Sequence, residues 1–240
     1  MGVRAISARG LGLAAVILAA GTAARAEVTE FEFTDFDRIV LSEAIELTVN
    51  TGADAYAVRG EAGGLSGTAR LQVKQEGDTL KIERTERWSP MMGLLDGQLR
   101  VYVDLPELKE LTVDSAALAR VVSGKAAQTV VFNVDSGGQL EVSQLDSELV
   151  RVHASSGGDL DISGRCSTLD VTASSGADVD LEDLRCQDAR VVASSGANVD
   201  VTATTRLQGD ASSGGDISVE GQPSQREVRS SSGGNISFDD

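Results

Sequence analysis

The sequence predicts an all-β protein, a right-handed parallel β-solenoid with about 19–20 residues per coil, preceded by an N-terminal region of strands and hairpins. Three observations carry this prediction. A Ser-Gly phrase recurs at a nearly fixed period in the second half of the chain. Apolar and polar residues alternate on both sides of that phrase, and no stretch after residue 26 shows a helical period.

Residues 1–26 predict a cleaved signal peptide. Arg4 and Arg9 give a positive start, and the apolar run that follows is too short to span a bilayer. Ala24-Arg25-Ala26 then supplies the small residues that signal peptidase needs, so we expect cleavage before Glu27. The alternative is an uncleaved anchor. Cleavage predicts a protein of the periplasm, or one secreted to the cell surface, of a Gram-negative bacterium, with no transmembrane span left.

Residues 27–113 predict the N-terminal β region of a single domain. Apolar and polar residues alternate in strand style from Ile39 to Val49. Tyr56 and Val58 predict a short strand that ends in a Gly-rich loop. Residues 71–73 and 80–82 predict a hairpin across Glu76-Gly77-Asp78.

One apolar cluster in this region lacks strand alternation, at residues 87–95. It contains the only Trp of the chain and two of its three Met. One interpretation is a loop that caps the end of the apolar stack. The other is an exposed patch that contacts a partner, as such patches on soluble proteins usually do. The residues of this candidate partner patch are Trp88, Met91, Met92, Leu94 and Leu95.

Residues 114–240 predict the β-solenoid repeats of the same domain. The repeated phrase is a Ser-Ser-Gly corner followed by an acid or amide, and it begins imperfectly at Asp114-Ser115-Ala116. The first glycines of the corners are Gly137, Gly157, Gly176, Gly196, Gly214 and Gly233, in steps of 20, 19, 20, 18 and 19 residues. Because the period is nearly constant, successive coils place equivalent residues on top of one another.

Counting each coil from its first glycine, positions −5, −3, +3 and +5 are apolar and are expected to face inward. After the corner these residues are Leu140, Val142, Leu160, Ile162, Val179, Leu181, Val199, Val201, Ile217, Val219, Ile236 and Phe238. Before the corner the pattern fades toward the last coils, at Gly209, Ala211, Val228 and Ser230. The sequence therefore predicts aliphatic columns inside the solenoid.

The two cysteines, Cys166 and Cys186, are 20 residues apart and each follows an arginine. One repeat separates them, so they are expected in register on neighbouring coils, within the Cα–Cα range of a disulfide. An exported protein meets an oxidising environment, and we expect a bridge. The alternatives are two small buried apolar side chains or, least favoured, a metal pair.

Outward columns next to the corner are rich in carboxylates. Stacked at the strand spacing, each neighbouring pair repels by about 0.9 kcal/mol at the dielectric constant of water. A solvated face is the favoured interpretation, and a Ca²⁺ site is the alternative, because carboxylate oxygens are its ligands; no other cofactor is expected. The weak metal candidates are Asp159, Asp161, Asp178, Asp180 and Asp200.

Charge and motifs narrow the function classes. The formal net charge of −16 argues against nucleic acid and anionic membranes as partners. No catalytic or phosphate-binding motif is recognisable, and the only histidine, His153, has no nucleophile beside it in the pattern. We therefore expect no catalytic residues, although a carbohydrate-active enzyme along the acidic columns is kept as the weakest alternative.

Four stretches of the N-terminal region resemble the head GIN domain family of autotransporter adhesins. They are FDRIVL (36–41) with IELTV (45–49), GDTLKI (77–82) and VYVDLPEL (101–108), and the repeated corners match the second half of that family. The resemblance covers roughly residues 30–238. It implies an exported, non-enzymatic β-helical protein that serves in adhesion or cell-envelope interaction, with an envelope protein or a glycan as partner, or with further copies of itself.

Overall fold

The computed structural model describes residues 27–64, 67–85, 96–123 and 127–239. The predicted signal peptide lies outside the described residues. So does the candidate patch of Trp88, Met91, Met92, Leu94 and Leu95, and both remain predictions. The described chain is almost entirely β, as predicted, with one short 3₁₀ helix, η1 (Gly67–Arg70). No helix among these residues is long and apolar enough to cross a membrane.

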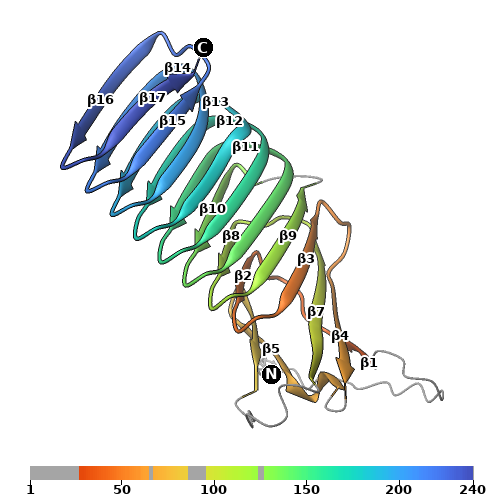
Figure 1. Cartoon of the computed structure of the whole chain (residues 1–240). Coiled ribbons are helices and arrows are strands. Elements are labelled where there is room, and N and C mark those ends of the chain that lie inside the picture. The colour runs from red at the N-terminus through yellow and green to blue at the C-terminus, as the bar shows by residue number, and fades with distance from the viewer. Residues whose placement is uncertain (1–26, 65–66, 86–95, 124–126, 240) are drawn as a thin grey trace, which may run out of the picture.

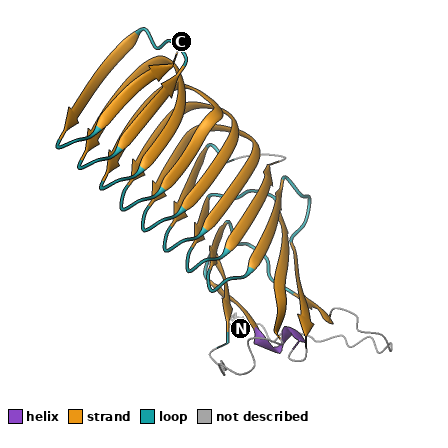
Figure 2. Ribbon diagram, in the orientation of Figure 1, coloured by secondary structure: helices purple, strands orange, loops and turns teal. Residues whose placement is uncertain are grey.

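The strands form one elongated stack of coils, with the N-terminal strands at one end and the last two strands at the other (Figures 1 and 2). The first half of the chain contributes β1 (Glu27–Phe31), β2 (Arg38–Leu41), β3 (Glu46–Thr51), β4 (Ala57–Gly64), β5 (Leu71–Glu76), β6 (Thr79–Arg84), β7 (Asp96–Leu105), β8 (Glu110–Val113) and β9 (Leu118–Ser123). The second half contributes β10 (Thr129–Val134), β11 (Gln139–Ala154), β12 (Asp159–Ala173), β13 (Asp178–Ser194), β14 (Asn198–Ser212), β15 (Asp216–Glu220), β16 (Gln225–Ser231) and β17 (Asn235–Asp239).

Two faces of the stack are hydrogen-bonded sheets. The first runs in the order β5, β6, β2, β8 and β10, continues through the second halves of β11 to β14, and ends at β16. The second runs β1, β4, β7, β3 and β9, continues through the first halves of β11 to β14, and ends at β15 and β17. The pairings are parallel except for β1–β4, β4–β7 and β5–β6, which are antiparallel. Each coil therefore lends one strand to each sheet.

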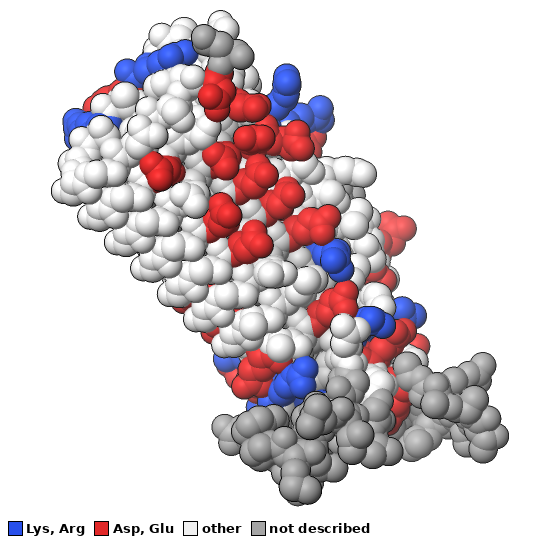
Figure 3. All heavy atoms as spheres, viewed as in Figure 1, with Lys and Arg blue, Asp and Glu red and all other residues white. Residues whose placement is uncertain are grey.

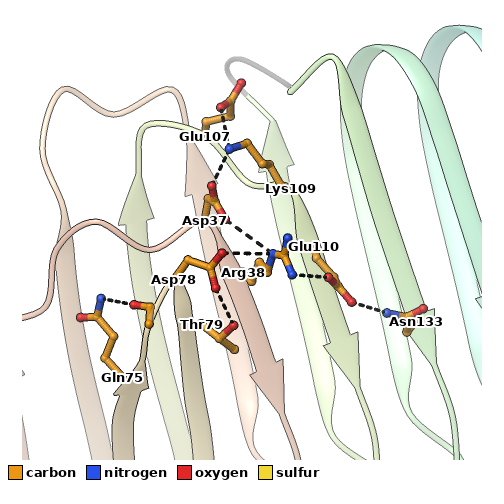
Figure 4. A network of polar contacts seen from close by, with 10 residues as sticks. Asp37, Arg38, Gln75, Asp78, Thr79, Glu107, Lys109, Glu110 and Asn133 are labelled. Atoms are coloured by element: carbon orange, nitrogen blue, oxygen red, sulfur yellow. Dashed lines mark hydrogen bonds and ion pairs between the residues drawn. The ribbon is translucent and has the colours of Figure 1, made fainter.

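The first coils are not stacked in chain order. β2 lies between β6 and β8, and β3 lies between β7 and β9, so a segment from the start of the chain is inserted into the stack. A polar network fixes this insertion on the first sheet (Figure 4). Arg38 of β2 contacts Asp78 beside β6 (3.6 Å) and Glu110 of β8 (3.7 Å), and Lys109 contacts Asp37 at 2.6 Å.

The Ser-Gly phrases are the corners between the two sheets, as predicted. At the corner of β11 and β12, Ser156 and Gly157 both have positive φ, at 53° and 73°. The corners are also hydrogen-bonded to one another, since the amide of Gly157 donates to the carbonyl oxygen of Ser175 in the next coil (3.2 Å). Small residues are needed here because the chain reverses within a few residues.

The corner ladder extends further toward the N-terminus than the predicted start at residue 114. The amide of Ala44, between β2 and β3, donates to Ser115 O at 3.1 Å, and Ala116 donates to Ser136 O at 3.2 Å. Ala44 and Ser115 themselves have positive φ. Residues 42–45 therefore form a corner of the same stack, although they contain no glycine.

The predicted inward columns form the core. Those from Phe132 to Val219 are buried, including Leu140, Leu160, Val179 and Val199. The columns open at the last coil, where Ile236 and Phe238 are partly buried and Val228 is 42% exposed. The predicted hairpin is also present, with Val73 opposite Ile82. The strand predicted at Tyr56 and Val58 begins at Ala57, so Tyr56 lies just before it. It continues to Gly64, into the predicted Gly-rich loop, because β4 pairs on both edges, with β1 and β7.

Candidate functional site

The acidic columns of the second sheet form the candidate site. We call this surface the acidic face; its carboxylates are Glu141, Asp159, Asp161, Asp178, Asp180, Asp200 and Asp216. The ladder places Asp159 beside Asp178, and Asp161 between Glu141 and Asp180. Asp180 is in turn beside Asp200. Figure 3 shows acidic side chains gathered over the middle coils of the stack. All five sequence-predicted candidates are thus on one surface.

The protonation equilibria of this face reflect crowding. The pKa of Asp161 is raised, first by desolvation and then by the charges of Asp180 and Glu141. The pKa of Asp200 is raised by desolvation and by Asp180. Beside them, the negative charge of Glu220 is the main reason that the pKa of Glu182 is raised. Like charges that share a surface disfavour one another's ionised form, so the raised pKa values show that these carboxylates repel one another.

The neutralising cations lie at one end of this face. Arg120 of β9 contacts Glu46 (3.0 Å) and Glu141 (3.1 Å), and Arg100 of β7 contacts Glu46 from the other side at 3.1 Å. Beyond Glu141, none of the aspartates of the acidic face forms an ion pair with a cation of the described residues. Along the second sheet, the charged side chains therefore alternate from Arg100 through Glu46 and Arg120 to Glu141. Beyond Glu141 the charged side chains of the acidic face are all carboxylates.

A shallow hollow of about 250 Å³ lies at this transition. Leu118, Arg120, Gln139 and Asp159 are among the residues that line it. Leu118 is an apolar residue in an outward column, between Glu46 and Gln139 in the two ladders. The hollow can accept a small apolar group beside a positive charge on one side and carboxylates on the other.

The acidic columns are less suited to holding a metal ion than to contacting an extended partner. Within the described ranges, no group of three or more His, Cys, Asp or Glu side chains is arranged to hold one. The aspartates point outward from a straight ladder and form rows instead of a closed shell. A Ca²⁺ ion prefers six to eight oxygen ligands.

The first sheet carries mixed charges at the equivalent outward positions. Arg151, Asp170 and Arg190 are in register, so the sign of the charge alternates along this column. Arg190 donates to Gln208 (3.4 Å) and does not pair closely with Asp170. His153 lies in the next outward column between Asn133 and Thr172, neither of which is an acid or a base.

The two cysteines lie at the turn opposite the Ser-Gly corners. Cys166 and Cys186 are direct ladder partners on neighbouring coils, with a Cα–Cα distance of 4.5 Å, and their sulfurs form a disulfide. Both side chains are buried. The bridge ties together coils that also carry the centre of the acidic face.

Several contacts were not predicted from the sequence. Arg84 donates to the carbonyl oxygens of Glu43 and Ala44, at 2.7 and 2.9 Å, and so holds the first corner. Asp135 replaces the usual corner serine; Ser155 donates to it at 3.0 Å, and this bond is the main reason that its pKa is lowered. The sequence gives no sign that β2 and β3 are inserted out of order. Without that stacking, the contact between residues 43 and 84 cannot be predicted.

The chain is similar in sequence and structure to known proteins. The family model described as "Putative auto-transporter adhesin, head GIN domain" matches residues 35–223. A "putative adhesin" of Bacteroides fragilis has a similar crystal structure, with a TM-score of 0.77, 12% identity, and coverage of 90% of this chain and 98% of that one. A "putative lipid binding protein" of Parabacteroides distasonis has a TM-score of 0.66 at 16% identity, covering 90% and 97%.

A third solved structure, a "putative adhesin" of Parabacteroides merdae, has a TM-score of 0.64 at 10% identity and again covers 90% and 97% of the two chains. At these identities the likeness shows a shared fold. No curated protein matches the chain. The family match spans most of the chain, including the inserted strands and nearly all the corners, and the chain therefore belongs to the head GIN domain family.

Proposed function

We propose that this chain is an exported, non-catalytic binding module of the cell envelope, and that the acidic face is its contact with a basic protein surface. The observation that carries the proposal is the row of aspartates on the second sheet, whose like charges have no cation partner among the described residues. A partner that brings Lys or Arg to this row relieves the mutual repulsion of Asp161, Asp180 and Asp200.

The shape of the face supports recognition of an extended partner. The outward residues follow the ladder at the strand spacing of roughly 4.8 Å, so the charges form a regular row on a rigid support. The hollow beside Leu118 and Arg120 adds an apolar position at one end of this row. A basic segment with an apolar residue near one end fits both features.

The family and the structural relatives support the class of function. The family description names adhesion, and two of the relatives are described as adhesins. One relative is described as lipid-binding. For this chain a negative face disfavours anionic lipid headgroups, which leaves a basic protein surface as the better fit. Among the described residues, no contact specifically favours the Ca²⁺ or the carbohydrate-active alternative.

The proposal is tested with two triple variants of equal charge. D161N/D180N/D200N neutralises the acidic face, and D170N/D188N/D210N removes the same charge from the first sheet. Binding to an immobilised lysine-rich peptide is measured by biolayer interferometry at 50 and 200 mM salt, with a neutral glycan array in parallel.

We expect salt-dependent binding of the unmodified protein to the peptide, because salt screens exposed charges. The acidic-face variant should bind at least tenfold more weakly, and the first-sheet variant should bind almost normally. Equal losses in the two variants would show that only net charge matters and would overturn the proposal. Salt-insensitive binding to a glycan would place the function in the glycan class instead.

A further inference from the structure

The last coil of the solenoid has two unpaired strand edges among the described residues. β16 pairs only with β14, and β17 pairs only with β15. All seven residues of β16 are exposed. The opposite end of the stack is covered differently, by antiparallel strands such as β1 and β5. Figure 1 shows β16 and β17 side by side at the C-terminal end.

This end also exposes the inside of the solenoid. Val228 aligns with the inward column of Gly209 and Val191 but is 42% exposed. Arg226 aligns with the buried Leu207, and its guanidinium lies 4.2 Å from the ring centroid of Phe238. The arginine therefore covers one of the apolar columns and leaves the column of Val228 open.

The charges on β16 are complementary to those of a second, antiparallel copy of the same strand. When two copies pair with Val228 opposite Val228, each Glu227 faces an Arg229 of the second copy on the outer surface. On the inner side Arg226 faces Ser230, whose hydroxyl can accept a hydrogen bond. Centring the pair on Glu227 or Arg229 instead would place like charges directly opposite, which is destabilising.

We propose that the last coil is a docking surface for a second copy of this chain, joined tail to tail by a two-fold axis through the β16 pair. The axis lies along the normal of the first sheet, perpendicular both to the solenoid axis and to the strands, so it reverses strand direction and the new ladder is antiparallel. The same axis brings β17 against β17 of the second copy. Such an interface is self-complementary: residue 227 contacts 229, and 229 contacts 227. The dimer satisfies both free edges, and it leaves the acidic faces of both copies accessible.

In the single chain, the two residues of the proposed intermolecular ion pair already contact each other. Arg229 contacts Glu227 of its own strand at 3.3 Å, with 76% and 63% of the two side chains exposed. Gln208 also donates to Glu227, at 3.2 Å. These contacts hold both side chains at the outer edge, where a second strand can exchange partners with them at little cost.

A charge-swap series tests the pairing. E227R and R229E each place like charges opposite one another in the dimer, and the double variant E227R/R229E restores complementarity. Sedimentation equilibrium from about 10 to 500 μM is expected to show a concentration-dependent dimer for the unmodified protein and the double variant. Each single swap should weaken the dimer at least tenfold. Thermal melting at low concentration checks that all four proteins are folded.

Cysteine trapping tests the register independently. The native cysteines are bonded to each other and the described residues contain no free cysteine, so V228C introduces one thiol. Antiparallel partners lie within the Cα–Cα range of a disulfide. We expect V228C to form a covalent dimer under mild oxidation and V122C, at a position with 44% exposure on β9, to remain monomeric. A monomer throughout the concentration series, or equal trapping of both variants, would overturn the proposal.

Discussion

Asp161 of β12 and Asp180 of β13 are direct partners in the parallel ladder, so two carboxylates of like charge lie side by side on the acidic face. Glu141 occupies the same column on the other side of Asp161. A fold that needed only stability would avoid this arrangement, because like charges directly opposite are destabilising. The column is therefore a cost to folding that the proposed contact with a basic partner would offset.

The substitution D161N is expected to stabilise the folded protein at pH 7. Each carboxylate neighbour at this spacing costs about 0.9 kcal/mol at the dielectric constant of water, and salt reduces this further. Since Asp161 is an exposed residue and solvent screens its charge, we expect a gain of about 0.5 kcal/mol in the free energy of unfolding. Urea denaturation at low salt measures it.

The pH dependence of that gain has a defined sign. Because the pKa of Asp161 is raised above its ordinary value of 3.8, the folded state binds its proton more tightly than the unfolded state. The free energy of unfolding then falls as pH rises from about 3.8 through the raised pKa of Asp161. The advantage of D161N should vanish below pH 3.8 and be complete above the raised pKa. D170N is the control, because Asp170 lies between Arg151 and Arg190 and should show no gain.

The repetitive part of the fold could be predicted from the sequence because every coil repeats the same pattern of residues. The inward columns, the corners and the register of Cys166 with Cys186 all follow from one period and one alternation. The columns of Asp159 and Asp161 follow as well, since ladder partners share a position in the repeat.

The N-terminal coils could not be predicted in the same way. β2 and β3 are stacked between later strands, and neither the period nor the corner phrase marks Ser42-Glu43-Ala44 as a corner. The apolar alternation of β2 and β3 shows that they are strands but does not identify the strands with which they pair. Arg226 was missed for a related reason: its neighbours suggest an exposed strand, whereas its column is inward from β10 to β14.

Glycine at position 164 is predicted to be irreplaceable. It has a φ of 142°, and a Cβ built there would overlap the carbonyl oxygen of Leu145. Backbone strain and overlap together should cost G164A about 3 kcal/mol or more. The matched control is G157A: Gly157 has a φ of 73° but no atom within 4 Å of the added Cβ. Only the left-handed conformation is penalised there, by about 1 kcal/mol. Equal losses by urea denaturation would contradict this assignment.

Removal of the Cys166–Cys186 bridge is predicted to destabilise the middle coils. The bridge closes a segment with a sequence separation of 20 residues, for which constraint of the unfolded chain contributes about 3 kcal/mol. We expect C166A/C186A to melt at a lower temperature than the unmodified protein under oxidising conditions. Dithiothreitol should lower the melting temperature of the unmodified protein and leave that of the variant unchanged. A variant as stable as the oxidised protein would show that the bridge contributes nothing.

The fragment 114–240 is predicted not to fold alone, although it contains every Ser-Gly corner. Strand β9 rests on β3 and β10 rests on β8, so removing residues 27–113 uncovers the inward side chains Ala119, Val121 and Phe132 at a new end of the stack. The matched truncation 27–220 removes β16 and β17 and uncovers Leu207, Ile217 and Val219, but it leaves all earlier coils in place. It should therefore still melt cooperatively, at a lower temperature than the chain 27–240. Circular dichroism and thermal melting compare the three proteins. A cooperative transition of 114–240 near that of 27–240 would show instead that the repeats are an independent folding unit and that the inserted strands are an accessory.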